Sequence, residues 1–370
     1  MAMANALDPT KAERDLRNWL STKIGHHRHL HIDHLEVPSS SGMSNDIAMF
    51  GATWTENDKE HHHELVARIQ PSGPGVFLTY DLAREYRLMK TLSESTAIPV
   101  PIVRWIETDP DVLGAPFMVM DRVSGQIAAD DPPFTTAGWV TKLSPPQRTT
   151  MYNNGLHALA YIHTVDWQDL GLEFLSRPEL GATGVEQKLT HYQQTYAWAA
   201  GARRYPTIEA ALRWASDNLP TGEPNVLCHG DARLANIVYA DDLSVASVLD
   251  WELSTLGSPE LDLGWWLFVM RHHTEGIGAP LPEGLPTAEQ TIAYYERLTG
   301  HTVEHIHFYE VFAAIFLSVT MIQVANVLTA AGLLPAGSTM AESNPATHIL
   351  ASLLGLPAPD AASSTFIGKR

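Results

Sequence analysis

The stretch VLCHGDARLANIVYADDLSVASVLDWELSTLG, which begins at Val226, places ionisable and amide side chains within a predominantly apolar sequence. Its segments NIVYA and VASVLDWE have the composition of β-strands, and DDLS between them is typical of a turn. In such a hairpin Asn236 falls opposite Leu249 or Asp250, and directly opposed residues have Cβ atoms roughly 5 Å apart. The stretch therefore predicts a hairpin whose open end joins an amide oxygen to a carboxylate. Both are oxygen ligands suited to Mg²⁺.

Length, charge and cysteine content restrict the class of protein. A chain of 370 residues can form two sub-domains or one large domain around a sizeable core. A formal net charge of −18 argues against a nucleic-acid partner, because phosphate binding needs a basic face. The single cysteine, Cys228, excludes an intramolecular disulfide and suits a reducing compartment. The first residues contain no apolar segment of signal-peptide length, so we expect a cytoplasmic protein.

One uncharged segment, residues 311–334, is long enough to cross a bilayer. No cluster of Lys or Arg flanks it as an orientation signal. Polar residues also interrupt it at Ser318, Thr320, Gln323 and Asn326. We therefore expect a buried helix within a helical domain, and no association with a membrane.

The pattern along the chain changes from strands to helices. An opening helix is predicted over Pro9–Lys23, with Asp8 as its N-cap. Strands are predicted in DIAMFGATW, in HELVARIQ and on both sides of the turn in IPVPIVRWIETDPDVLGAPFMVMDRV, and YDLAREYRLMKTL has helical periodicity. From residue 145 the pattern is mostly helical. This predicts an α+β chain with a small antiparallel-sheet lobe over residues 1–120, a connector over 121–125 and a large, mostly helical lobe over 126–370.

Two residues of the small lobe are predicted to form a buried pair. Glu85 falls in the middle of the apolar stripe of its helix, three residues from both Leu82 and Leu88. A carboxylate on an apolar helix face is costly unless it is paired, and Arg68, on the strand LVARI, is its natural partner. The alternative is that Glu85 reaches solvent along the surface.

Several motifs of the chain resemble those of a known family. HGDARLAN, from His229, matches the H-x-D-x-x-x-x-N catalytic loop of kinases, and Asp250 in DWE stands where protein kinases have the Asp of D-F-G. His-Gly-Asp followed by Asp-Trp-Glu resembles the aminoglycoside phosphotransferase-like branch of the kinase superfamily. GMSNDIAMF, DLAREYRLMKTL, DVLGAPFMVMDRVSG and LDWELSTLGSPELDLGWW are similar to a subgroup abundant in actinobacteria. Similar sequences form the kinase-like domain attached to some acyl-CoA dehydrogenases, and the resemblance covers about residues 39–266.

The resemblance implies a bilobal protein-kinase-like fold and roles for the residues of the loop. Asp231 would be the catalytic base, or at least the carboxylate that orients the substrate hydroxyl, and Arg233 would reach the transferring phosphoryl group. Asn236 and Asp250 would hold Mg²⁺ on the phosphates of ATP. His229 would brace the loop without taking part in the chemistry. These roles suit phosphoryl transfer, which depends on positioning and charge neutralisation more than on covalent catalysis.

The resemblance also implies a nucleotide site in the small lobe. Arg68 and Glu85 would replace the Lys–Glu pair of kinases, although a guanidinium is a planar fork and not a compact charge. The loop PSSSGMSND holds one glycine where protein kinases have three, so its hydroxyls and backbone N–H groups would cradle the phosphates. The residues expected to bind ATP are Ser41, Gly42, Ser44, Arg68, Glu85, Met120, Asp121 and Val123.

The implied activity is ATP- and Mg²⁺-dependent phosphorylation of a hydroxyl group on a small molecule. The resemblance implies two classes of acceptor, aminoglycosides and hydroxyacyl-CoA thioesters, and the sequence does not choose between them. It does not predict the oligomeric state. Asp262 is expected to brace the catalytic loop. Candidate acceptor contacts are Glu252, Tyr196, Trp198 and Trp265. A pseudokinase that binds nucleotide or another ligand without turnover is the alternative, because of Arg68 and the glycine-poor loop.

Two runs of histidine, GHHRHLHIDH and HHH, suggest a further alternative, a His-rich metal-binding protein. Neither run contains H-E-x-x-H, and the chain offers no set of cysteine ligands. Consecutive side chains on a strand point to opposite faces, so we expect both runs to be solvated.

Overall fold

The structure is a computed structural model that describes residues 7–38, 45–71, 73, 75–335 and 337–359. The chain divides into two compact units, Met1–Ser124 and Gly125–Arg370, and each is described by itself. The boundary falls inside the segment 121–125 expected to connect two lobes. Three residues expected to bind phosphate, Ser41, Gly42 and Ser44, lie outside the described residues.

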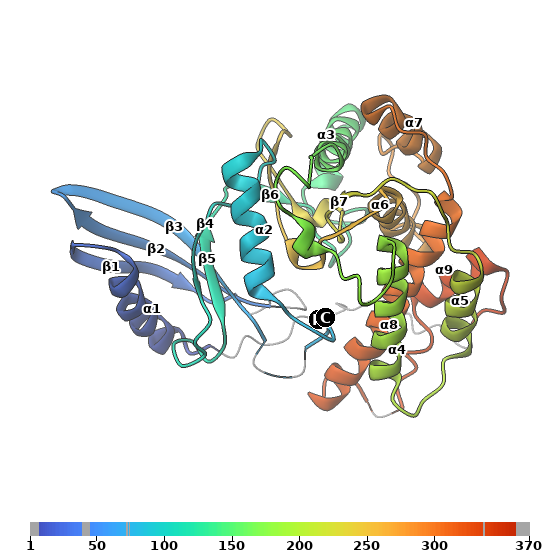
Figure 1. Ribbon diagram of the computed structural model, residues 1–370, viewed down its shortest axis with the longest axis horizontal. Coiled ribbons are helices and arrows are strands. Elements are labelled where there is room, and N and C mark those ends of the chain that lie inside the picture. The colour runs from blue at the N-terminus through green and yellow to red at the C-terminus, as the bar shows by residue number, and fades with distance from the viewer. Residues whose placement is uncertain (1–6, 39–44, 72, 74, 336, 360–370) are drawn as a thin grey trace. The chain divides into compact units, whose positions relative to one another are not determined.

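The first unit is built on a five-stranded antiparallel sheet in the order β1-β2-β3-β5-β4 (Figure 1). Its strands are β1 (His27–Glu36), β2 (Asp46–Glu56), β3 (Lys59–Ile69), β4 (Val103–Glu107) and β5 (Phe117–Asp121), and its helices are α1 (Pro9–Lys23) and α2 (Leu82–Ser95). The helix predicted over Pro9–Lys23 is confirmed, and Asp8 caps it by accepting hydrogen bonds from the backbone N–H groups of residues 10 and 11.

The core of this unit lies between α1 and one face of the sheet. Leu16 and Leu20 of α1 are fully buried, and they belong to one apolar cluster with Phe50, Ala52 and Trp54 of β2. These three β2 residues have period two, because alternate side chains of a strand face the same side. The apolar stripe of α1 therefore packs against the buried side chains on one face of β2.

The histidine runs lie on β1 and β3. β1 forms one edge of the sheet, and its imidazole groups are exposed or half-buried, as expected for a solvated run. In β3, His62 is exposed, whereas His61 and His63 stack on the indole of Trp54 with ring centroids 5.5 and 4.9 Å away. The expectation of solvation therefore holds for the first run and only in part for the second.

The second unit is mainly helical. Its helices are α3 (Pro145–His163), α4 (Gly184–Ala200), α5 (Pro206–Asp217), α6 (Glu260–His272), α7 (Ala288–Thr299), α8 (Ile306–Ala330) and α9 (Pro345–Leu354). Its short strands are β6 (Gln126–Ile127), β7 (Val226–Cys228), β8 (Ile237–Tyr239), β9 (Val245–Val248) and β10 (Thr255–Gly257). Single 3-10 turns are η1 (Val140–Lys142), η2 (Glu173–Leu175), η3 (Leu234–Asn236), η4 (Trp251–Leu253) and η5 (Glu275–Ile277). The predicted α+β organisation is confirmed.

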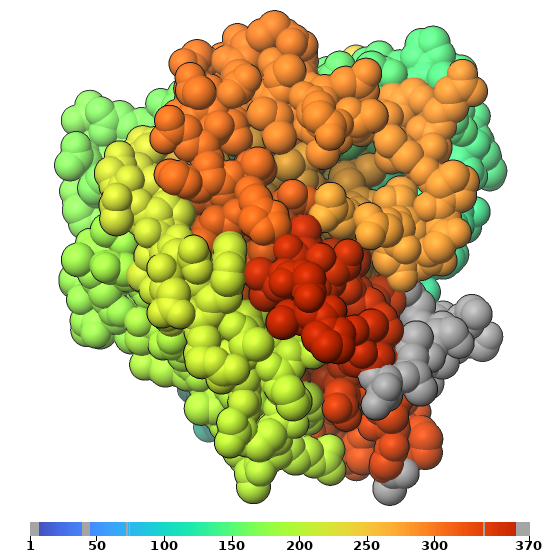
Figure 2. Space-filling model, turned by 90° about the vertical axis from the view of Figure 1, so that its right-hand side faces the viewer, coloured from blue at the N-terminus to red at the C-terminus, as the bar shows by residue number. Residues whose placement is uncertain are grey.

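Helix α8 is the core helix of this unit. It contacts α4, α5, α6 and α9, and Figure 2 shows α9, in red, on the surface beside α5. Among the residues that the structure describes, α8 alone is long and apolar enough to cross a membrane by length and composition. Of its most apolar window, 78% is buried within the protein, which agrees with the predicted core helix. The helix ends at Ala330, four residues before the predicted end.

The hairpin of the motif stretch forms with shorter strands than predicted. Ile237 pairs with Val248, and the backbone N–H of Leu249 donates to Asn236 O at 2.8 Å, so the predicted juxtaposition is confirmed. The second strand ends at Val248 and does not continue through residue 252. Asp250 then adopts a left-handed conformation, with φ 66° and ψ 63°, which turns the chain out of the strand.

The reason for this early end is the burial of Trp251. Its indole is 1% exposed, and its Nε1–H donates to the carbonyl oxygen of Val248 at 2.9 Å. A regular strand would point successive side chains to opposite faces, whereas the turn buries this ring and redirects the carboxylate before it.

Candidate active site

Strand β7 leads directly into the loop that carries Asp231, and a carboxylate from another helix holds this loop. Asp262, in the first turn of α6, accepts hydrogen bonds from the backbone N–H groups of His229 at 2.6 Å and Gly230 at 2.8 Å. Gly230 has φ 87°, and a Cβ atom there would lie 2.0 Å from Leu253 O. The expectation that Asp262 braces the loop is confirmed.

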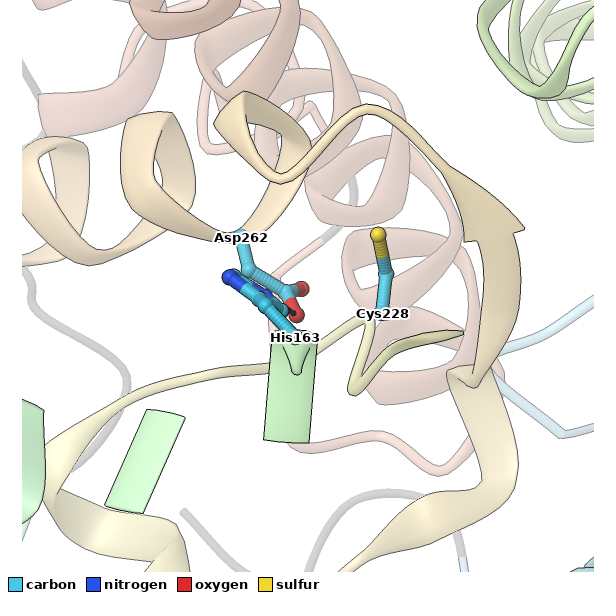
Figure 3. A group of neighbouring side chains, drawn as sticks. All are labelled: His163, Cys228 and Asp262. Carbon is cyan, nitrogen blue, oxygen red and sulfur yellow. Dashed lines mark hydrogen bonds and ion pairs between the residues drawn. The ribbon is translucent and has the colours of Figure 1, made fainter. Parts of the chain in front are cut away.

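Asp262 also belongs to a buried cluster with His163 of α3 and Cys228 of β7 (Figure 3). The His163 Nε2 lies 3.1 Å from Asp262 Oδ2, and its Nδ1 lies 2.6 Å from the hydroxyl of Tyr295. The thiol of Cys228 donates to Ser258 O at 3.3 Å. Burial alone would raise the pKa of Asp262, but its bonds to His163 and the loop lower that pKa below the usual range. The three side chains have hydrogen-bond partners within the protein, so we assign this cluster to support of the loop and not to metal binding.

His229 makes its contacts with the backbone. Its Nε2 lies 2.8 Å from Leu249 O, and its Nδ1 accepts from the backbone N–H of Asp231 at 3.2 Å. The ring also meets the indole of Trp251 edge-on at 4.7 Å. These contacts tie the loop to the end of the hairpin, which is the bracing role expected of this residue.

Three side chains converge on the carboxylate of Asp231, which is 8% exposed. The indole N–H of Trp265 donates to Oδ1 at 2.7 Å, and the amide of Asn236 donates to Oδ2 at 2.9 Å. The Arg233 Nε lies 3.0 Å from Oδ1 and 3.1 Å from Oδ2. Burial raises the pKa of Asp231, Arg233 opposes that shift, and the nearby charge of Asp250 adds to it. These contacts hold the Asp231 carboxylate in one orientation.

Arg233 is shared between two carboxylates. Besides Asp231 it forms an ion pair through Nη1 with Asp130, a residue that sequence reasoning missed. Burial lowers the pKa of His273 to about 3, so its imidazole is neutral where its Nε2 lies 3.6 Å from Asp130 Oδ1. The pair DD in AADDPP was a visible signal, but it lies about a hundred residues before the loop, and no periodicity connects the two segments.

Asn236 and Asp250 provide a donor set that fits Mg²⁺. Asn236 is buried at the end of η3, and its Nδ2 donates to the backbone and the side chain of Asp231, which leaves its oxygen as the free acceptor of the amide. Asp250 follows the second strand at the same open end of the hairpin, and its left-handed conformation turns the chain there, near enough to Asp231 for its charge to affect that residue's pKa. A hard divalent cation would relieve the repulsion between these carboxylates.

In the first unit, the predicted pair of Arg68 and Glu85 forms. The Arg68 Nε lies 3.5 Å from Glu85 Oε2, and the two side chains are 11% and 3% exposed. The alternative of a solvent-reaching Glu85 is therefore wrong. The helix α2 that carries Glu85 is capped by Asp81, which accepts from Arg84 N at 2.9 Å.

The other expected nucleotide contacts lie at the end of β5. Met120 is buried and pairs with Val66 of β3, and Val123 follows the strand. The carboxylate of Asp121 accepts from the Nη2 of Arg104 at 2.8 Å. Asp121 therefore has a structural partner within the sheet.

The candidate acceptor contacts separate into three groups. Trp265 joins the Asp231 site through its indole N–H, a role that sequence reasoning did not assign. Tyr196 instead donates to Glu209 Oε1 at 2.6 Å on α5, and Trp198 is exposed on the same helix as Tyr196. Glu252 lies in η4, two residues after Asp250.

Sequence comparisons match the chain to one family model and to curated relatives. A model described as the phosphotransferase enzyme family matches residues 40–301 of the chain. Acyl-CoA dehydrogenase family member 11 from Homo sapiens is 32% identical over 243 residues, which cover 64% of this chain and 30% of that protein. A probable acyl-CoA dehydrogenase from Arabidopsis thaliana is 29% identical over 251 residues, covering 64% and 29%. The chain thus spans less than a third of the length of these relatives.

Solved structures show the fold. A putative aminoglycoside phosphotransferase from Ralstonia eutropha is similar with a TM-score of 0.65 and 23% identity, covering 92% of this chain and 95% of that one. A choline kinase from Streptococcus pneumoniae has a TM-score of 0.54 and 12% identity, covering 93% and 98%. The predicted bilobal kinase-like α+β fold is confirmed.

Proposed function

The chain belongs to the phosphotransferase enzyme family, and we propose that it transfers a phosphoryl group from ATP to a hydroxyl group of a small molecule. The observation that carries this proposal is the convergence of Trp265, Asn236 and Arg233 on the Asp231 carboxylate. A carboxylate held in this way has its orientation set before the acceptor arrives, which is the main requirement of phosphoryl transfer.

Five residues of the second unit have roles in this proposal: Asp231, Arg233, Asn236, Asp250 and Trp265. Asp231 accepts the proton of the acceptor hydroxyl, and its raised pKa makes it a better base than an exposed carboxylate. Trp265 and Asn236 are positioning residues for that carboxylate. Arg233 supplies positive charge beside the phosphoryl group. Asn236 and Asp250 would hold Mg²⁺, which neutralises charge on the ATP phosphates.

In the first unit, Arg68 is proposed to bind the phosphates of ATP, with Glu85 as its positioning residue. The buried salt bridge with Glu85 restrains the orientation of the Arg68 guanidinium. A guanidinium presents several donors in a fixed plane, which suits phosphate oxygens.

The test measures binding and turnover separately. Calorimetric titration of ATP with and without Mg²⁺ should show Mg²⁺-dependent binding to the wild-type protein. Asp231→Asn should retain that binding and lose transfer to the acceptor by about two to four orders of magnitude. Asp241→Asn, which removes the same charge from the exposed hairpin turn, is the matched control and should change neither. If Asp231→Asn lost ATP binding to the same extent as it lost phosphoryl transfer, the role assigned to Asp231 would be refuted.

The acceptors tested first follow from the names of the relatives. Those relatives are called acyl-CoA dehydrogenases, so hydroxyacyl-CoA thioesters come first and aminoglycosides second. Transfer of labelled phosphate to an acceptor supports the proposal. Mg²⁺-dependent ATP binding with no transfer to either class would favour the alternative of a pseudokinase.

A further inference from the structure

A cavity of about 320 Å³ lies in the second unit, at the end of the β7–β10 pair that is remote from Asp231. It is lined by the first residues of α4, by the loop 220–225 and by residues 256–258. In the antiparallel register, Gly257 pairs with Val226 at the cavity, whereas Thr255 pairs with Cys228, the residue before the catalytic loop. The cavity is therefore separate from the site proposed for phosphoryl transfer.

The charge of the lining comes from one carboxylate. Among the described residues around the cavity, Glu223 alone is ionisable, and its neighbours carry hydroxyl, amide or apolar side chains. Glu223 is half-buried and accepts a hydrogen bond from the hydroxyl of Tyr309. Burial raises the pKa of Glu223, and the nearby carboxylate of Glu260 raises it further. A positive group placed on Glu223 would relieve both effects.

The N-terminus of α4 also borders the cavity, but its positive end is already compensated. Thr183 and Glu186 form a capping box, in which Thr183 N donates to Glu186 Oε2 at 2.8 Å and Glu186 N donates to Thr183 Oγ1 at 3.3 Å. The Glu186 carboxylate thus occupies the position where a helix N-terminus would attract an anion. The remaining charge of the cavity is the negative charge of Glu223.

The walls of the cavity are held in place by the fold. Gly184, at the start of α4, lies so close to β10 that a Cβ atom there would be 2.3 Å from Leu256 O. Pro220 and Pro224 restrict the backbone of the loop that carries Glu223. A cavity of this size with fixed walls and both apolar and polar lining is typical of a small-molecule site.

We propose that this cavity binds a small organic cation, with a primary ammonium group on the Glu223 carboxylate and an apolar group against the apolar part of the lining. The lining supplies both kinds of residue: its apolar residues are Ala182, Val185, Pro220, Pro224 and Leu256, and Thr221 and Ser258 provide hydroxyl groups near the carboxylate in sequence or in space. This binding site does not depend on the proposed phosphotransferase activity.

The experiment uses benzylamine as the probe, because it joins a primary ammonium group to a compact ring. Ligand-detected NMR and calorimetry should show saturable binding to the wild-type protein, with one site per chain. In Glu223→Gln the dissociation constant should rise about tenfold or more, the loss of one charge-assisted hydrogen bond. The amide oxygen of Gln can still accept from Tyr309, so the variant should fold with an unchanged or raised melting temperature.

Two matched controls make the result specific. Benzyl alcohol has nearly the same size without the charge and should bind much more weakly than benzylamine. Glu179→Gln removes an exposed carboxylate from the same unit and should leave benzylamine binding unchanged. No saturable benzylamine binding to the wild-type protein, equal binding of the alcohol, or equal weakening in Glu179→Gln would each overturn the proposal.

Discussion

Replacing Asp262 by asparagine should destabilise the second unit through the catalytic loop. The Asp262 carboxylate is completely buried and accepts from three donors, which are His229 N, Gly230 N and the His163 ring. Asparagine keeps one acceptor oxygen but turns an NH₂ group toward N–H donors. One buried donor then loses its acceptor and the charge opposite His163 is lost, so we expect a decrease of about 3–5 kcal/mol in the free energy of unfolding.

Urea denaturation, followed by tryptophan fluorescence and by circular dichroism, measures this change. Asp241→Asn, in the exposed turn of the hairpin, is the control and should stay within about 0.5 kcal/mol of the wild type. The low pKa of Asp262 means that its contribution is present above the pKa of the unfolded chain and is lost as the pH falls through the folded value. The stability difference between wild type and Asp262→Asn should therefore shrink in acid. A loss below about 1 kcal/mol at neutral pH would refute the assignment of Asp262 as the support of the loop.

Two further predictions concern the first unit. Arg68→Met should lower the free energy of unfolding by about 3–5 kcal/mol, because it removes the positive charge that faces the buried Glu85 carboxylate. Thermal melting should show that the double variant with Glu85→Leu recovers much of this loss, and an additive double variant would contradict the pairing. The pKa of Glu107 is lowered to about 2, first by the backbone N–H of Asp109 and then by the Trp19 indole and a lysine. The stabilising effect of the Glu107 carboxylate should be present above about pH 4.5 and lost as the pH falls toward 2. Acid unfolding of Glu107→Gln should therefore begin at a higher pH than that of the wild type, and the stability of the variant should depend less steeply on pH. An acid-unfolding profile identical to that of the wild type would refute this prediction.

The sequence by itself determined the local elements and the order of the motif residues. A cap and a proline define the start of α1, the residue composition indicates β2, and the two-residue alternation of LVARI indicates β3. The helical period places Glu85 among apolar residues, and the cost of burying its charge points to Arg68. The spacing within HGDARLAN, with Asp250 after it, is likewise local information. These features depend on backbone geometry and on neighbours within about one hairpin, so a single sequence contains them.

Only the tertiary structure decided which distant groups complete the site. Asp130, Trp265 and Asp262 come from segments far apart in the chain, and they meet Asp231 and its loop because β6, β7 and α6 pack in one unit. The left-handed turn at Asp250 also depends on packing, since it buries the next side chain, Trp251, in the core. No local propensity encodes such contacts. They arise from the burial of apolar surface across the whole unit, which fixes where polar side chains from separate segments must find partners.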